Sequence, residues 1–322
     1  MNAPVQEKGT PSRRRHKDSS RDRQAAEARR DDRTVDRQKC TGAMVLNVSS
    51  MILTDDEFRL FSQLIYNESG IAIRDTKRDF LQARLQKRLQ AIQMGSYYRY
   101  YKFVTDRTQG QRELMDLVDS LTINETSFFR NRPQFDLLTS LVIPELKRRK
   151  EGNLKLRFWS AGCSRGQEAY SIAMSILSHQ EFSNAWDIKI VASDISLRVL
   201  ENAQRGAYSP FEAETVSPPY LQTYFEKIDG HYHVKPQVKK LVVFDYHNLK
   251  HENGLNGLDG IFCRNVMIYF DRDEQKRLID KFYSSLADGG YLFLGHSESL
   301  QGITDKFKFI YHNKGAVYQK TG

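Results

Sequence analysis

Apolar positions with helical spacing dominate the first ordered stretch of the chain. Thr54 followed three residues later by Glu57 forms a capping box, which predicts the start of a helix, and Gly70 suits its end. The buried face of this helix is predicted at Phe58, Phe61, Leu64 and Ile65. Three further helices are predicted from their own apolar faces: the second from Leu81, Leu85, Leu89 and Ile92, the third from Tyr97, Tyr100, Tyr101 and Val104, and the fourth from Leu114, Leu117, Val118 and Leu121. Four short helices joined by brief turns predict an all-helical domain over residues 44–128.

From residue 154 the pattern changes to strands that alternate with helices. Strands are predicted at residues 154–160, 187–194, 239–248, 258–265 and 289–297, helices at 167–179, 196–205 and 273–286, and a closing hairpin at 307–320. This alternation predicts an α/β domain over residues 129–322 with a doubly wound parallel sheet, and we expect a small inserted β subdomain at 209–239. A terminal antiparallel hairpin on such a sheet is more typical of methyltransferases than of dinucleotide dehydrogenases.

The charge of the chain is unevenly distributed. The 322 residues hold 49 Lys and Arg against 40 Asp and Glu, a net charge of +9. Residues 1–40 carry 12 of the basic and 7 of the acidic side chains, so they supply +5 of the excess. Residues 1–43 offer almost nothing to bury and are predicted to be a disordered basic tail. A basic balance favours nucleic acid or an acidic partner, but here most of it lies outside the predicted domains.

Composition restricts the class of protein further. A hydrophobic fraction of 39% with 11% aromatic residues allows a sizeable core. No apolar run approaches the ~20 residues of a membrane span, and no signal peptide opens the chain. Cys40, Cys163 and Cys263 are far apart and form no C-x-x-C pair. We therefore expect a reduced, cytoplasmic protein that is not inserted in a membrane.

Candidate ligand-binding residues follow the first two strands. In an open α/β sheet ligands bind beyond the carboxyl ends of the strands. Gly162 and Gly166 stand in a G-x-x-x-G arrangement, so the dinucleotide fingerprint is absent, and no Lys-Ser/Thr follows to make a phosphate loop. Asp194 ends the second strand and is suited either to binding ribose hydroxyls or to capping the next helix; Glu168 is suited to the helix dipole. Together these residues favour S-adenosylmethionine over NAD.

Four separated motifs give the chain a resemblance to a known family. They are LTINETSFFR at 121–130, FWSAGCSRGQE at 158–168, FCRNVMIYF at 262–270 and GHSES at 295–299. In this order they resemble the bacterial chemotaxis receptor methyltransferases, the CheR family, over residues 50–320. The resemblance implies an S-adenosylmethionine-dependent protein-glutamate O-methyltransferase, which yields S-adenosyl-L-homocysteine and acts on acidic methylation helices of methyl-accepting chemoreceptors in chemotactic adaptation.

The resemblance also implies roles for individual residues. Asn124, Thr126 and Arg130 match residues that close over the cofactor, and Glu168 matches an acid that contacts it. Asp194 matches the residue that binds the ribose. Asn248 and Leu249 match residues on the adenine side, and Arg264 and Asn265 match residues on the methionine side. Arg130 and Tyr269 match residues beside the transferring methyl group. Each has an ordinary alternative: Arg130 as a link between domains, and Tyr269 as a core aromatic residue.

This residue set suits the implied reaction. A glutamate with a pKa of ~4.3 is already an anion at neutral pH, so no general base is needed. Arg130 would hold the carboxylate and Tyr269 would act as a neutral donor, so catalysis is mainly alignment. We predict no metal site: His231 and His233, two residues apart on a predicted strand, are an isolated pair.

The polar face of the second predicted helix indicates how an acidic partner would be bound. Lys77, Arg78, Arg84, Lys87 and Arg88 lie on or beside it with one nearby acid, Asp79. Such a run is either a solvated face or a surface for an acidic helix. We predict that Arg84 and Arg88 bind the receptor.

The insertion raises two questions of specificity. Residues 225–233 look shorter and less glycine-rich than in family members that grip a C-terminal receptor peptide, so we expect no peptide tether. Ser217-Pro218-Pro219-Tyr220 resembles a signature of methyltransferases that act on amino groups of nucleic acids or glutamine. That signature belongs after the fourth strand, which Arg264 to Met267 fill, so we predict a turn and a helix with Pro near its start, and no nucleic acid.

The sequence is compatible with two rival functions. The first is an RNA methyltransferase, which the basic charge favours and the motif after the fourth strand opposes. The second is a non-catalytic S-adenosylmethionine-binding signalling protein, which Arg130, Asp194 and Tyr269 oppose. For the methyltransferase we expect a monomer, recruited to receptor arrays at the inner membrane.

Overall fold

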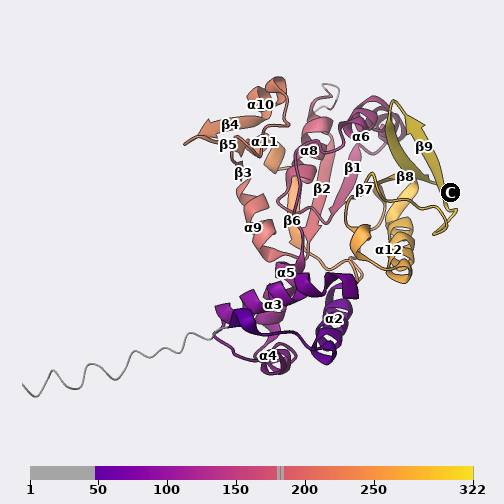
Figure 1. The fold of residues 1–322 in the computed structure, drawn as a ribbon. Coiled ribbons are helices and arrows are strands. Elements are labelled where there is room, and N and C mark those ends of the chain that lie inside the picture. Colours follow the sequence, from indigo (N-terminus) through magenta and orange to yellow (C-terminus); the bar gives the residue numbers. More distant parts are fainter. Residues whose placement is uncertain (1–47, 180–181, 183–184, 322) are drawn as a thin grey trace, which may run out of the picture. The chain divides into compact units, whose positions relative to one another are not determined.

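The four predicted N-terminal helices are present. The computed structural model describes residues 48–179, 182 and 185–321, and the predicted tail at 1–43 lies outside them. After a short 3₁₀ turn, η1 (Val48–Ser50), the chain forms α2 (Asp55–Ser69), η2 (Asp75–Lys77), α3 (Arg78–Ala91), α4 (Tyr97–Val104) and α5 (Gln111–Leu121) (Figure 1). Both halves of the capping box at Thr54 are formed, and Gly70 ends α2 in the left-handed conformation with φ of 77°.

Two helices at the start of the α/β domain were missed by the sequence pattern. They are α6 (Arg132–Leu137) and α7 (Ile143–Lys150), joined by a π-helical turn, η3 (Leu138–Val142). Proline in a helical stretch normally indicates a break, and Pro144 follows this turn closely. The π turn is closed by a hydrogen bond from Ile143 N–H to the Leu138 carbonyl. With this turn in place, the helical path continues past Pro144.

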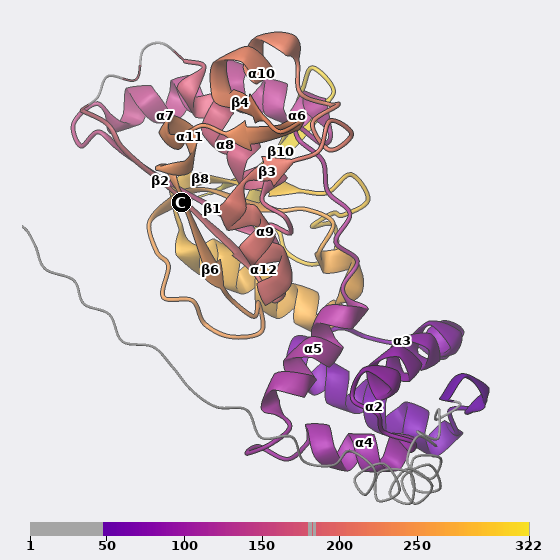
Figure 2. The same cartoon turned by 90° about the vertical axis from the view of Figure 1, so that its left-hand side faces the viewer.

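The predicted doubly wound sheet and its terminal hairpin are confirmed. Five parallel strands are joined by an antiparallel pair in the order β6-β2-β1-β7-β8-β10-β9. The strands are β1 (Lys155–Ala161), β2 (Asp187–Asp194), β6 (Val242–Tyr246), β7 (Leu258–Cys263), β8 (Leu286–Leu294), β9 (Phe307–His312) and β10 (Gly315–Lys320). Figure 2 shows the same sheet after a quarter turn.

Helices cover both faces of this sheet. Alternate residues of β1 enter different cores: Phe158 packs in the cluster that contains residues of α8 (Gln167–Leu177) and α9 (Leu197–Arg205). Trp159 packs instead in the cluster that contains α12 (Arg272–Ser285). This period of two is expected of a strand buried on both faces.

The insertion is a small β subdomain, as predicted, and its sheet has three strands. It comprises β3 (Ala207–Tyr208), α10 (Pro218–Tyr224), β4 (Phe225–Ile228), β5 (His231–Val234) and α11 (Pro236–Lys239), with the strand order β3-β5-β4. Ser217 is the N-cap of α10 and Pro218 its first residue, so the predicted turn and helix are confirmed. His231 and His233 both lie on β5. None of the described helices is long and apolar enough to cross a membrane.

Candidate active site

One cavity gathers every residue that the sequence assigned to the cofactor or to catalysis. It lies at the carboxyl ends of β1, β2 and β7, and its lining includes Asn124, Thr126, Arg130, Glu168, Asp194, Asn248, Leu249, Arg264, Asn265 and Tyr269. Ser69 and Ile71, at the end of α2, also line it. The sequence pattern did not indicate this contribution from the helical domain. The individual contacts of these residues with a cofactor stay predictions.

Two glycines shape the loop after β1. Both have positive φ, 81° at Gly162 and 86° at Gly166, which is the N-cap of α8. A Cβ on Gly162 would lie 2.5 Å from a methyl carbon of Val266, in the segment after β7. The positive φ and the close packing between these two segments therefore both require glycine there.

Asp194 presents its carboxylate to the cavity with both oxygens already held by backbone donors. Ser164 N–H donates to Oδ2 at 2.8 Å and Ser196 N–H to Oδ1 at 3.0 Å. The N-cap of α9 is Ser196, so the helix-capping alternative for Asp194 is wrong. Burial raises the pKa of Asp194, although these hydrogen bonds oppose the rise. The remaining lone pairs suit the two hydroxyls of a ribose.

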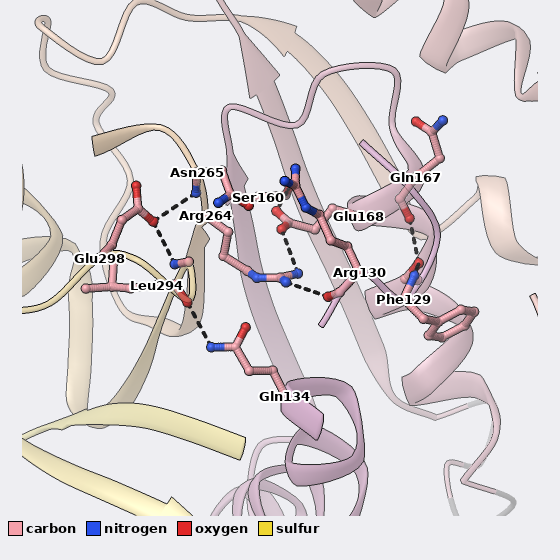
Figure 3. A network of polar contacts seen from close by, with 12 residues as sticks. Phe129, Arg130, Gln134, Ser160, Gln167, Glu168, Arg264, Asn265, Leu294 and Glu298 are labelled. Carbon is pink, nitrogen blue, oxygen red and sulfur yellow. Dashed lines mark hydrogen bonds and ion pairs between the residues drawn. The ribbon is translucent and has the colours of Figure 1, made fainter. Parts of the chain in front are cut away.

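Glu168 forms a buried network with Arg264 instead of serving only the helix dipole (Figure 3). Its carboxylate accepts a hydrogen bond from Ser160 Oγ at 2.7 Å and lies 3.3 Å from Arg264 Nη1. Burial raises the pKa of Glu168 and lowers that of Arg264. The Arg264 Nη2 donates to the Arg130 carbonyl, while its buried Nε has no partner among the described residues.

Arg130 occupies a turn with unusual backbone geometry. Its neighbours Phe129 and Asn131 both have positive φ, 52° and 58°, a conformation that costs of order 1–3 kcal/mol for a residue other than glycine. The exposed Arg130 side chain lines the cavity, and its Nη1 donates to the Glu125 carbonyl at 2.9 Å. Strain of this kind persists only where surrounding contacts hold it.

Tyr269 is half-buried and ends the 3₁₀ turn η4 (Met267–Tyr269), where it lines the cavity. Burial raises the pKa of its phenol, the Glu125 carboxylate adds to the rise, and the Arg130 charge opposes it. The phenol is therefore neutral at physiological pH and able to donate a hydrogen bond. The position differs from that of a core aromatic residue.

Glu298 supports the loop that carries Asn265 and Tyr269, a role that the sequence did not show. Its carboxylate accepts hydrogen bonds from the backbone N–H groups of four residues, Gly295, Asn265, Val266 and Ile268, at 2.6, 2.8, 3.0 and 3.3 Å. A Cβ on Gly295 would lie 2.5 Å from Glu298 Oε2. Within the GHSES motif, then, the glycine gives room to the glutamate, and the glutamate fixes the loop.

The Asn248 side chain links the cavity wall to the helical domain. Its Nδ2 donates to the Glu68 carbonyl at 2.5 Å, and its Oδ1 accepts from Lys250 N–H at 3.0 Å. Leu249 follows it in the lining of the cavity. Contact of both residues with adenine stays a prediction, and these bonds indicate that Asn248 also fixes the wall.

The cationic face of α3 is less free than the sequence pattern indicated. Arg88 donates to Glu113 at 2.8 and 2.6 Å and to Asp116 at 3.0 Å, and Arg78 lies 2.9 Å from Asp55. The expectation that these cations lack balancing acids is therefore wrong for Arg78 and Arg88. Their partners are on other helices and come close only in the fold.

The cavity matches the chemistry of S-adenosylmethionine. Asp194 offers a carboxylate at the end of β2, Glu168 a second acid, and the Arg264 Nε a buried donor without a partner among the described residues. The amino-acid end of the cofactor is zwitterionic and needs an acceptor for its ammonium group and donors for its carboxylate, while its ribose hydroxyls need an acceptor. The fold and the site thus define a methyltransferase that uses S-adenosylmethionine.

Comparison with known proteins gives the family. Residues 124–316 match the CheR methyltransferase SAM-binding domain, and residues 56–122 match the CheR methyltransferase all-alpha domain. The chain is 34% identical over 277 residues to chemotaxis protein methyltransferase 2 of Vibrio cholerae, covering 85% of this chain and 96% of that protein. It is 36% identical over 274 residues to the chemotaxis protein methyltransferase of Salmonella typhimurium, covering 83% and 92%. The chain belongs to the CheR family of S-adenosylmethionine-dependent protein methyltransferases.

Proposed function

We propose that this enzyme methylates glutamate carboxylates on cytoplasmic helices of chemoreceptors, with Arg130 and Tyr269 at the reacting groups. The observation that carries the proposal is the pairing of a cation and a neutral donor in one cavity: the charge of Arg130 acts on the Tyr269 phenol there. Family membership supports the reaction, and the acidic character of the substrate fits the cationic Arg130.

The reaction asks little of the protein beyond orientation. S-adenosylmethionine, when bound, supplies a methyl group on a sulfonium, and the leaving group is a neutral thioether. Arg130 binds the glutamate carboxylate, which is ionised at neutral pH and needs no base. Tyr269 donates a hydrogen bond, and its raised pKa keeps that proton on the phenol. These two contacts align the nucleophilic oxygen with the methyl group. Alignment of reacting atoms by itself gives a large rate enhancement.

The cellular setting belongs to the same proposal. We place the enzyme in the cytoplasm, as a monomer recruited to receptor arrays at the inner membrane. The short turn Asp229–Gly230 between β4 and β5 supports binding of receptors without a C-terminal peptide tether. Micromolar binding of an isolated receptor tail, measured by calorimetry, would contradict the last point.

Transfer of tritiated methyl groups tests the proposed acceptor. Incubation with receptor-containing membranes should label the receptor, and mild base should release the label as methanol because methyl esters hydrolyse readily. Incubation with total RNA should give no labelled RNA. Base-stable label on RNA would favour the RNA methyltransferase, and cofactor binding without any turnover would favour the non-catalytic signalling protein.

A charge reversal on α3 tests the receptor surface. Arg84, which stacks on the Phe80 ring at 5.1 Å, and Lys87 have no ion pair among the described residues. We expect Arg84→Glu with Lys87→Glu to raise the KM for receptor about tenfold, because a cationic surface facing acidic helices becomes repulsive. The measurement is initial rate against receptor concentration at low ionic strength.

The control for this pair is the Kd for S-adenosylmethionine, which should stay unchanged. Arg88 remains a predicted receptor residue, but Arg88→Glu is a poor test. It would place a third carboxylate beside Glu113 and Asp116 and destabilise the helical domain itself. Unchanged receptor kinetics in the Arg84 and Lys87 double variant would remove α3 from the receptor surface.

A further inference from the structure

The turn that carries Arg130 is held by polar contacts on both sides of that residue. On one side the Phe128 carbonyl accepts from Thr215 Oγ1 at 2.8 Å, and Phe129 N–H donates to Ser171 Oγ at 3.0 Å. On the other side the Arg130 carbonyl accepts from Arg264 Nη2. Figure 3 shows Phe129 and Arg130 beside α8 and the Arg264 guanidinium. These contacts hold the backbone around a side chain that itself stays exposed.

Ser171 is well placed to fix this backbone. It lies on α8 with no exposed surface, and its hydroxyl donates to the Gln167 carbonyl at 2.6 Å. With its proton committed to that carbonyl, the Oγ lone pairs accept from Phe129 N–H. The orientation of this acceptor therefore depends on the helix and not on the turn.

The second support comes from the same helix. Glu168 lies one turn before Ser171 and pairs with Arg264, which in turn donates to the Arg130 carbonyl. Residues three apart on a helix lie on the same face. Residues on one face of α8 thus hold the turn at two points. Ser171 binds the Phe129 N–H directly, and Glu168 holds the Arg130 carbonyl through Arg264.

We propose that Ser171 is a positioning residue for methyl transfer: it holds Phe129 in its left-handed conformation and so directs the Arg130 guanidinium into the cavity. The positive φ of Phe129 requires such a constraint, because an aromatic residue disfavours that conformation, whereas asparagine, as at Asn131, adopts it more readily. This inference rests on the catalytic role of Arg130 proposed above. Ser171 itself does not line the cavity.

Ser175 provides a matched control for Ser171. It lies one turn further along α8, is equally buried, and its Oγ has no partner among the described residues. Ser171→Ala should lower kcat about tenfold to hundredfold at saturating cofactor and receptor, since small misplacements of a catalytic group have effects of this size. The KM for receptor should change by less than threefold, and Ser175→Ala should leave both constants unchanged.

A double-mutant cycle with Arg130→Ala separates this inference from the proposed function. If Ser171 acts through Arg130, Ser171→Ala causes no further loss of kcat once Arg130 is alanine. A loss of equal size in both backgrounds, or a kcat of Ser171→Ala within threefold of the wild type, would overturn the positioning role. A wild-type kcat for Arg130→Ala alone would instead overturn the catalytic role of Arg130.

Asn131 keeps the inference testable if Ser171→Ala fails to fold. Its half-buried side chain makes no capping bond, so the substitution disturbs little except the backbone. Glycine adopts positive φ freely, so Asn131→Gly should retain kcat within twofold of the wild type. Asn131→Val should lower kcat about tenfold, because β-branched residues avoid positive φ. Equal kcat values for the two variants would show that the backbone of the turn does not matter and would overturn the inference.

Discussion

Arg130→Ala is expected to lower kcat for receptor methylation by about two to three orders of magnitude, the range found when one preorganised donor to a reacting oxygen is removed. The Arg130 guanidinium lines the cavity, and only its Nη1 makes a hydrogen bond within the described chain, to the Glu125 carbonyl. Its other donors remain for a substrate carboxylate. The change in kcat is measured from quenched time points of tritiated methyl transfer at saturating receptor.

Arg130→Lys should recover part of the loss. A lysine keeps the charge but loses the planar fork that binds a carboxylate through two parallel hydrogen bonds. We expect its kcat to lie between those of the wild type and the alanine variant. A lysine variant no better than alanine would show that fork geometry, and not charge, decides the rate.

Arg132→Ala is the control for both substitutions. Arg132 is two residues away on α6, is exposed, and pairs loosely with Asp136 at 3.9 Å. It does not line the cavity that contains Arg130. Its removal should leave kcat unchanged, so equal losses at both positions would indicate a general effect on the segment and would contradict the catalytic role.

The elements that the sequence predicted well are those whose signals are local. The capping box at Thr54 and the left-handed Gly70 define α2 with nearby residues alone. The strand β2 is bounded by Asp187 and Asp194, as the apolar pattern predicts. Signals of this kind depend on neighbours within about one turn, so no tertiary contact is needed to recognise them.

The contacts that the sequence could not predict join residues far apart in the chain. Arg88 is paired with Glu113, which is 25 residues away, and Phe129 is bonded to Ser171, which is 42 residues away. Glu298 reaches back 33 residues to the Asn265 backbone. A helix face that looks cationic in sequence therefore loses part of its charge in the fold. The cavity residues could nevertheless be predicted from the resemblance to the family, because the family's motifs contain residues that come together only in the fold.

Asp194→Asn is expected to raise the Kd for S-adenosylmethionine about a hundredfold. Both carboxylate oxygens accept from backbone donors, Ser164 N–H and Ser196 N–H, so an amide must turn its NH₂ group toward one of them. The variant loses a backbone hydrogen bond and the charged acceptor for ribose. Two charge-assisted hydrogen bonds of about 1.5 kcal/mol each account for a hundredfold change. Calorimetric titration at pH 7.5 measures it.

The pH dependence of the same Kd provides an independent test. Because burial raises the pKa of Asp194, its carboxylate is protonated at a higher pH than an exposed aspartate with a pKa of ~3.9. The wild-type affinity should therefore fall on acidification before ordinary carboxyls titrate. Glu168, whose pKa burial also raises, contributes to the same decline. In Asp194→Asn only the Glu168 part should remain.

Asp245→Asn completes the comparison. Asp245 lies on β6 directly beside Ser193 of β2, is exposed, and does not line the cavity. The same chemical change one strand away should leave the Kd and its pH profile unchanged. Thermal unfolding of both variants without cofactor checks that each is folded. A folded Asp194→Asn protein with wild-type affinity would show that ribose is held elsewhere, because no other change in that variant could compensate for the lost acceptor.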